Sequence, residues 1–534
     1  MGKKSFLKGA AVLGATGLVV QVLGAFFRIP LANIISEEGM GYYQTVYPVY
    51  VFLLIFSTNG APAAISKMTS ERLTVGLAGE AHRVFKLSFI VMLAFGAVAS
   101  SVFFFGARQI IDIMNVHEKS YYAMIAISPA LLLIPVMSVF RGYFQGMQEM
   151  GPTALSQLVE QSVRVGTGLA LAIALLPMGI EYSAGGASLG TSIGPVAGII
   201  VIAIIYRTRR RKILGIVDTC NNEQREKAGS ILKTLAVIAV PITIGVSIYP
   251  VMNLADAFLV QRRLVFTGLD ENAANALYGQ LTGFAGPIIN VPMALALSMA
   301  LSMVPAIAAA SSSKDVEFLE SNVKLGLRTA MIVGVPCSFG LIILAEPIMR
   351  LIYPMQMESA TGAASSLAVL SSGIVFLCVA QTMAGVLQGM GRMGIAVLSI
   401  TVGFIVKCAA TYVFVAVPSL GIEGAAIGSV LGFVTVAVIS FSAVRRLTEI
   451  RFDFTLSVAK PLAAGLIMGV IVIALYKGLA LAVGSRLAAA VAVCAGAGAY
   501  TVALIKIKAI VESEITMLPK GAKLAALLRK ARLL

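Results

Sequence analysis

The sequence holds few of the residues from which catalytic and metal sites are built. It has 2 histidines and 5 cysteines in 534 residues, and neither set shows the spacing of a zinc site or of a disulfide framework. No Gly-Lys-Ser or Gly-Lys-Thr loop occurs that could cradle the phosphates of a nucleotide, so ATP is not expected as the energy source. Nothing else resembles a catalytic apparatus. We therefore expect no enzyme, no bound metal and no cofactor.

Charged residues are also scarce, at 12% of the chain, whereas hydrophobic residues make up 58%. The mean hydropathy is +0.92. A soluble domain is about half apolar and could not bury so large a share. A membrane-spanning helix needs about 20 mostly apolar residues, and many such runs follow one another here. Their apolar residues are continuous rather than alternating, which excludes a porin-like barrel and predicts an all-α integral membrane protein.

Hydropathy predicts about fourteen membrane-spanning helices. The apolar run after Lys3 and Lys4 counts as the first span rather than a signal peptide, because no small-residue cleavage site follows it. The spans are expected near residues 6–28, 44–66, 84–106, 121–143, 153–177, 184–206, 231–256, 276–308, 323–350, 364–389, 394–417, 422–444, 459–483 and 486–507.

The formal net charge of +16 is distributed unevenly along the chain. Most Lys and Arg residues lie in every second loop and in the two tails, which predicts that both termini are cytoplasmic. This distribution argues against a nucleic-acid partner. The basic loop 211–230 is expected to contact anionic phospholipids at the cytoplasmic face. The tail 508–534 carries leucines and cations at helical spacing, which is typical of a helix in the membrane interface; a partner-binding helix is the alternative.

An internal repeat organises the spans. The segment 145–151, Gln-Gly-Met-x-x-Met-Gly, recurs at 388–394, an offset of 243 residues. The same offset aligns Arg164 with Lys407. The repeat predicts two six-helix lobes of the same orientation, with a cavity between them at mid-depth. The expected organisation is an N-lobe at 1–210, the basic loop at 211–230, a C-lobe at 231–445, two extra helices at 446–507 and the tail at 508–534.

Charges inside the predicted spans mark a candidate site, because each costs at least ~2.5–3.5 kcal/mol to insert. Arg28 ends the first span, Arg164 lies in the fifth, and Lys407 occupies the equivalent place in the eleventh. Guanidinium groups suit pyrophosphate because they donate two parallel charge-assisted hydrogen bonds. We therefore predict a cation-lined cavity that receives an anionic headgroup. Three further polar residues share a helix face with Arg164: Gln157, Glu160 and Gln161.

A plainer interpretation of these residues stays open. Glu160 and Arg164 are four residues apart and could neutralise each other for insertion, while Arg28 could reach the outer interface. Asn253 and Asp256 share one face of the seventh span and form a candidate site for a coupling ion, Na⁺ or H⁺. The membrane potential is the other candidate energy source.

Four motifs resemble those of one family of membrane proteins. They are Glu-Glu-Gly-Met-Gly-Tyr at 37–42, Gly-Ala-Pro-Ala-Ala-Ile-Ser-Lys at 60–67, Arg-Gly-Tyr-Phe-Gln-Gly at 141–146 and Gln-Leu-Val-Glu-Gln-Ser-Val-Arg at 157–164. The chain resembles, over its whole length, the stage V sporulation protein B branch of polysaccharide exporters. These belong to the multidrug/oligosaccharidyl-lipid/polysaccharide (MOP) superfamily, near the MurJ lipid II flippases.

The resemblance implies a flippase in the bacterial cytoplasmic membrane that works by alternating access without ATP. Its expected cargo is an undecaprenyl-pyrophosphate-linked precursor such as lipid II, or a polysaccharide unit, and cell-wall synthesis proteins are further expected partners. The resemblance also implies that the last two spans hold the lipid tail, and that Arg28 matches a cavity arginine. Where MurJ proteins carry a Tyr-x-Asp-Arg motif, this chain reads Tyr-Gly-Gln-Leu at 278–281. Arg164 with Arg262 or Arg263 is therefore expected to bind the substrate instead.

Two other functions fit parts of the sequence. A drug or metabolite antiporter of the same superfamily would use acidic cavity residues, for which Glu160 and Asp256 are the candidates within spans. A scaffold for envelope or spore-cortex assembly would need no transport site at all. The intramembrane cations favour the flippase over both.

Overall fold

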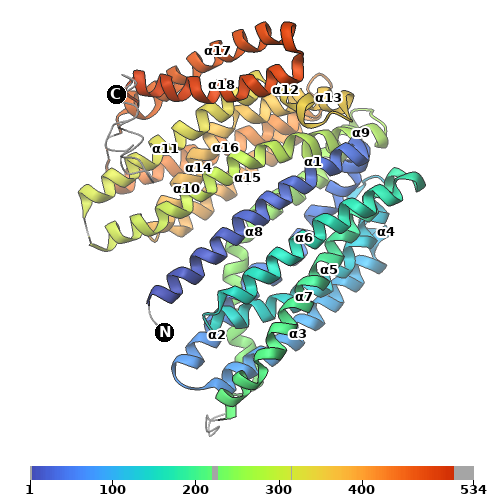
Figure 1. Cartoon of the computed structure of the whole chain (residues 1–534), viewed down its shortest axis with the longest axis vertical. Helices are drawn as coiled ribbons and strands as arrows, with labels where there is room; N and C mark the ends of the chain where they lie inside the picture. Colours follow the sequence, from blue (N-terminus) through green and yellow to red (C-terminus); the bar gives the residue numbers. More distant parts are fainter. Residues whose placement is uncertain (1–2, 219–225, 314, 451, 510–534) are drawn as a thin grey trace. The chain divides into compact units, whose positions relative to one another are not determined.

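The computed structural model describes residues 3–218, 226–313, 315–450 and 452–509. Every regular element within these ranges is a helix, which confirms the all-α fold (Figure 1). The α-helices are α1 (Lys3–Ile55), α2 (Ala61–Thr74), α3 (Ala78–Phe105), α4 (Ala107–Met114), α5 (Ser120–Gly146), α6 (Met150–Leu175), α7 (Ile180–Asp218), α8 (Ala228–Phe266), α9 (Glu271–Gly279), α10 (Gly286–Ser313), α11 (Val316–Ile343), α12 (Ala345–Ile352), α13 (Met357–Ser372), α14 (Ile374–Gly389), α15 (Met393–Phe414), α16 (Glu423–Thr448), α17 (Lys460–Val483) and α18 (Ser485–Lys506). Short π or 3-10 segments adjoin them at η1 (Phe56–Gly60), η2 (Leu176–Met178), η3 (Gln280–Ala285) and η4 (Thr455–Ala459).

The chain forms two compact units, 1–279 and 280–534. In the first, α5 packs against α3 and α7, and α6 packs against α1 and α7. Helix α8, which we expected to open the C-lobe, contacts α1 and α2 and groups with the first unit. In the second, the main helix pairs are α10 with α14, α15 with α16, and α17 with α18 (Figure 1). The predicted lobe boundaries stay a prediction.

Helix α1 is two helices joined at a sharp break. Its 53 residues would extend about 80 Å at 1.5 Å per residue, more than twice the ~30 Å of a bilayer's hydrocarbon core. Ser36, with φ 59° and ψ −175°, leaves the helical region and separates a first arm (3–35) from a second arm (37–55). Arg28 of the first arm contacts Tyr47 of the second, so the arms lie beside each other. The first two predicted spans begin on separate arms.

The fold is that of a multi-pass membrane protein, but the number fourteen is not confirmed. Eleven helices in the described ranges are long and apolar enough to cross a membrane, or 12 if the pair α13 and α14, bent by 43°, makes one span. The run Val12–Thr74 counts once although both arms of α1 lie in it. The apolar part of α8, Ala228–Ile244, is a shorter helix by the same measure. With α13 and α14 counted as one span, these two segments account for the difference between 12 and the predicted fourteen.

The internal repeat is visible in how the helices pack. A Cβ added to Gly190 of α7 would lie 2.8 Å from the carbonyl oxygen of Arg164 on α6. A Cβ added to Gly428 of α16 would lie 3.1 Å from the carbonyl oxygen of Lys407 on α15. Small residues at these positions let the backbones approach closely. The α6–α7 and α15–α16 pairs therefore repeat one packing arrangement, as the sequence predicts.

The segments expected to be cytoplasmic are described only in part. Helix α7 continues to Asp218, so the start of the predicted loop 211–230 is helical. Residues 219–225 lie outside the described ranges, as does the predicted interfacial helix in the tail beyond Ala509. At the end of the second unit, Lys460 donates to the carbonyl oxygen of Lys508 at 2.9 Å, and Arg328 donates to that of Ala509. Both cations thus bind backbone carbonyl oxygens just beyond the end of α18.

Candidate functional site

Three tyrosines form a row on the second arm of α1. Tyr43, Tyr47 and Tyr50 are spaced four and three residues apart, so they share one helix face. The ring centroids of Tyr43 and Tyr47 are 5.7 Å apart, with an angle of 22° between the ring planes. The ring centroids of Tyr47 and Tyr50 are 5.8 Å apart. Tyr43 and Tyr50 are buried and Tyr47 is half-buried. The row gives α1 a polar aromatic face inside the first unit.

Two arginines lie over the ring of Tyr47. The guanidinium carbon of Arg28, on the first arm of α1, is 5.4 Å from the ring centroid, and that of Arg164, on α6, is 5.6 Å away. A cation at this distance from an aromatic face gains about 0.5–2 kcal/mol, more as the site is desolvated. The two sequence-predicted arginines are therefore brought to one aromatic group.

Arg164 is held by hydroxyl groups rather than by a carboxylate. Its Nη2 donates to the hydroxyl oxygens of Tyr43 and Tyr47, each at 3.4 Å, while its Nε is buried with no acceptor. Among the residues that the structure describes, no carboxylate forms an ion pair with Arg28 or Arg164. Partly buried cations without an acid are costly unless an anion joins them. The pair therefore offers two positive charges and an unused donor.

Glu160 does not neutralise Arg164, contrary to the plainer interpretation of the sequence. Its Oε2 accepts from Nη2 of Arg141 on α5 at 2.7 Å, and Nε of Arg141 donates to Oγ of Ser156 at 2.9 Å. Only 18% of the Glu160 side chain and 14% of the Arg141 side chain are exposed. Helical spacing placed Glu160 beside Arg164, but the packing of α5 against α6 supplies a nearer cation.

The other predicted residues of α6 differ in placement. Gln161 is buried, and its Nε2 lies 3.6 Å from where a Cβ on Gly24 would be, so it packs against the first arm of α1. Gln157 is half-buried. Gln161 is therefore next to the helix that carries Arg28, one turn from Arg164.

Helix α8 reaches the second arm of α1, where Nε2 of Gln261 donates to Oγ1 of Thr45 at 2.6 Å, but the candidate residues on α8 make other contacts. Arg263 stacks on Phe266 with its guanidinium carbon 4.5 Å from the ring centroid, in the last turn of α8, and Arg262 is exposed. Asn253 and Asp256 are half-buried, and Asp256 acts electrostatically on the hydroxyl of Tyr278. Across the described residues no group of three or more His, Cys, Asp or Glu side chains could hold a metal ion. The coupling-ion site stays a prediction.

Lys407 occupies in the second unit the place that Arg164 has in the first. It is buried, and its Cβ lies 3.0 Å from where a Cβ on Gly432 would be. The Cβ of Arg164 lies 2.8 Å from the corresponding point on Gly194. The two cations therefore share one packing environment, each within its own unit.

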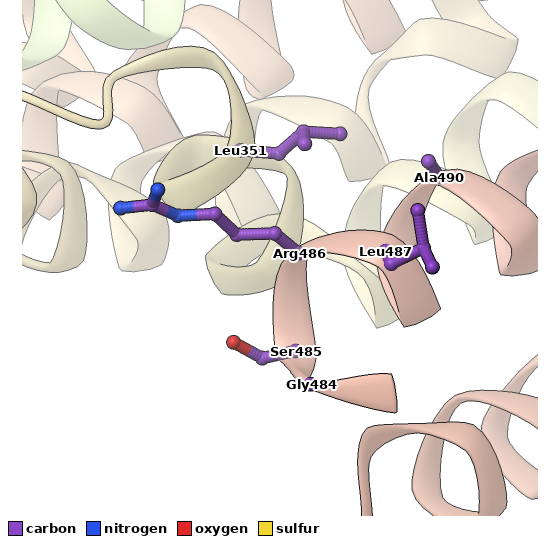
Figure 2. Close-up of a pocket in the computed structure, with 6 residues that line it drawn as sticks. All are labelled: Leu351, Gly484, Ser485, Arg486, Leu487 and Ala490. Carbon is purple, nitrogen blue, oxygen red and sulfur yellow. The ribbon is translucent and has the colours of Figure 1, made fainter. Parts of the chain in front are cut away.

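The second unit also contains a cavity of about 470 Å³ at the turn between α17 and α18. Figure 2 shows its six lining residues, with the Arg486 side chain extending from the start of α18. Sδ of Met357 accepts from Arg486 at 3.8 Å. None of the sequence-predicted site residues lines this cavity. It lies on the two helices expected to hold a lipid tail.

Sequence reasoning did not single out two parts of the site. The row of tyrosines could have been predicted from Gly-Tyr-Tyr-Gln-Thr-Val-Tyr-Pro-Val-Tyr at 41–50. Tyrosine is enriched at the membrane interfaces, so several tyrosines at helical spacing within one span indicate a face that packs against protein rather than lipid. Arg141 had no such signal. The motif at 141–146 indicates only a family resemblance, and Glu160, the partner of Arg141, lies on another helix.

The fold matches those of solved membrane transporters. The inward-facing structure of a multidrug resistance MATE family transporter of the MOP superfamily matches with a TM-score of 0.69 at 17% identity, covering 80% of this chain and 94% of that one. The inward closed structure of the lipid II flippase MurJ matches with a TM-score of 0.68 at 14% identity, covering 92% and 98%. The chain thus shares its fold with these two transporters.

Sequence comparison gives the family. The family model described as polysaccharide biosynthesis protein matches residues 6–311, and the MatE model matches 241–413. The chain belongs to the polysaccharide biosynthesis protein family. It is 28% identical to stage V sporulation protein B of Bacillus subtilis over 97% of this chain and 98% of that protein. It is 25% identical to the lipid II flippase MurJ of the same organism over 82% of each. These relatives and neighbours include transporters and flippases and no enzyme, as expected.

Proposed function

We propose that the protein is a flippase that moves an undecaprenyl-pyrophosphate-linked cell-wall precursor, lipid II or a similar polysaccharide unit, from the inner to the outer leaflet. The observation that carries the proposal is the pair Arg28 and Arg164 on the ring of Tyr47, with no carboxylate paired to either in the described part of the chain. Two guanidinium groups that contact one aromatic ring supply positive charge and paired hydrogen-bond donors of the kind that bind a pyrophosphate. The relative named lipid II flippase carries a cargo of this chemistry.

The direction of transport follows from charge. About two negative charges leaving the cytoplasm across 100 mV gain roughly 4.6 kcal/mol, at ~2.3 kcal/mol per charge. The membrane potential alone therefore favours export, by alternating access of the two units and without ATP. Coupling of transport to Na⁺ or H⁺ at Asn253 and Asp256 is the alternative energy source that we propose beside the membrane potential. We propose that both termini lie in the cytoplasm, as the distribution of Lys and Arg predicts.

The lipid tail is proposed to lie along α17 and α18. These helices pack on α11 through buried Met468, Val472 and Tyr500. Their outer faces expose large apolar side chains, among them Val470 at 68% and Leu481 at 93%. Such a surface suits acyl or prenyl chains. Anionic phospholipids and cell-wall synthesis proteins stay proposed partners at the cytoplasmic face.

A drug or metabolite antiporter is the second candidate, favoured by the MatE match over 241–413. Export of organic cations would use an available acid in the site. Glu160 is instead paired with Arg141 at 2.7 Å. If this function were correct, expression in a pump-deficient host would raise resistance to cationic drugs, and we expect no change. A scaffold without transport would tolerate loss of both cavity arginines.

The test is growth of a strain depleted of its own lipid II flippase. We expect R28A and R164A to support no growth at wild-type protein levels. R108A is a matched control, because Arg108 makes the same kind of contact, 5.4 Å from the ring of Tyr121, on an exposed part of α4. It should support growth like the wild type. Normal growth with both R28A and R164A would contradict the proposal.

A further inference from the structure

Glu160 is the acid that the helix geometry would give to Arg164. The two residues are four apart on α6, with the acid nearer the N-terminus, which is the favourable order for an ion pair within a helix. A carboxylate on Arg164 would cancel one of the two charges over Tyr47. Arg28 and Arg164 can therefore form an anion site only if Glu160 is paired with a cation other than Arg164.

Arg141 holds Glu160 in a closed network between α5 and α6. Besides its bonds to Glu160 and to Oγ of Ser156, Arg141 accepts at its carbonyl oxygen from Oγ1 of Thr153 at 3.5 Å. The hydroxyl of Ser156 donates in turn to the carbonyl oxygen of Thr153 at 2.9 Å. The guanidinium group of Arg141 is thus fixed by hydrogen bonds from Nε and from Nη2, and the Glu160 carboxylate is turned toward α5.

The internal repeat supplies a comparison within the same chain. At the offset of 243 residues, Arg141 corresponds to Ala384 on α14 and Glu160 to Gly403 on α15. The second unit keeps a cation at the Arg164 position, as Lys407, but has neither the acid one turn before it nor the arginine across from that acid. Acid and arginine are present together in one unit and absent together in the other.

We propose that Arg141 is a positioning residue: it sequesters Glu160 and so keeps Arg164 available for an anionic substrate. The proposal rests on the proposed function of the Arg28 and Arg164 site. When Arg141 is lost, Glu160 turns to Arg164, and the site falls from two positive charges to one. Loss of Glu160 has the opposite consequence, because Arg164 then has no competing acid.

The test is binding of farnesyl pyrophosphate to the purified full chain in detergent, measured by calorimetry beside the thermal stability of each variant. We expect R141Q to bind at least tenfold more weakly than the wild type, E160Q to bind as tightly or more tightly, and R141Q/E160Q to regain wild-type affinity. R141K, which keeps the charge, should retain most of the binding. A purely structural ion pair predicts equal damage from R141Q and E160Q, with affinity following thermal stability.

Failure of this inference is distinguishable from failure of the proposed function. If R164A abolishes binding but R141Q binds like the wild type, or R141Q/E160Q stays as weak as R141Q, the positioning role is wrong and the anion site stands. If the wild type and R164A bind farnesyl pyrophosphate equally, or neither binds it, both are wrong.

Discussion

Arg28 and Arg164 lie on the same ring, with guanidinium carbons 5.4 Å and 5.6 Å from the centroid of Tyr47. One comes from the first arm of α1 and the other from α6, so the break at Ser36 is what lets the two arms present Arg28 and Tyr47 together. Each guanidinium group is stabilised by its contact with the ring of Tyr47. An anionic group entering there would neutralise part of their positive charge.

The ring of Tyr47 should matter more than its hydroxyl. Y47L removes both cation–π contacts and should weaken farnesyl pyrophosphate binding about tenfold or more, equivalent to about 1.4 kcal/mol. Y47F keeps the ring and loses one of the two hydroxyl acceptors of Arg164, so its affinity should change only a few-fold. Calorimetry on the two purified variants checks this. Equal losses in Y47F and Y47L would show that the hydroxyl, not the ring, places the arginines.

A new acid beside Arg164 should reproduce the effect of releasing Glu160. Q161E puts a carboxylate three residues before Arg164 while Arg141 stays paired, and we expect binding to fall at least tenfold. Q161L is the matched control, because it removes the amide without adding charge. The prediction fails if Q161E and Q161L bind the pyrophosphate equally well.

Close packing of α6 on α7 should make Gly190 intolerant of a side chain. G190A would press a methyl group into Gly168 and the carbonyl oxygen of Arg164, an overpacking that costs about 1–3 kcal/mol. A methyl group added by G166A, on α6, meets nothing within 4 Å, so this variant should be neutral or gain up to about 1 kcal/mol from helix propensity. Apparent melting temperatures in detergent test the pair. A G190A protein as stable as G166A would contradict the packing described.

If both termini are cytoplasmic, the two ends of α8 are accessible from opposite sides of the membrane. Lys227 precedes the helix and Asp270 follows it, and both side chains are exposed. In a background with the native cysteines replaced by alanine, D270C should react with an impermeant thiol reagent in whole cells, whereas K227C should react only after lysis. The reverse pattern would overturn the cytoplasmic assignment of the termini. Labelling of both from outside would show that α8 does not cross the membrane.

The sequence predicted the fold well where the signal is carried along single helices. Hydropathy predicts the multi-pass α-helical class, and the offset between Arg164 and Lys407 predicts the repeated packing seen in both units. The predicted count of fourteen exceeds the count in the structure partly because the run Val12–Thr74, which holds two predicted spans, is counted as one. Hydropathy also cannot report a bend such as that between α13 and α14.

The site was predictable in its cations but not in their partners. Arg28 and Arg164 stand out as charges in apolar runs. Helical spacing suggested Glu160 as the partner of Arg164, and this was wrong because Arg141, on another helix, reaches the same carboxylate at 2.7 Å. Contacts between helices depend on how α5 and α6 pack, which one sequence does not encode in any local spacing.

The most direct test of the anion site compares three ligands of the purified protein: farnesyl pyrophosphate, farnesyl monophosphate and farnesol. The account predicts that the wild type prefers the pyrophosphate, that the monophosphate is weaker and farnesol weakest, and that R28A and R164A each abolish the preference. Equal affinity of the wild type for all three, or a preference that persists in both variants, would contradict it.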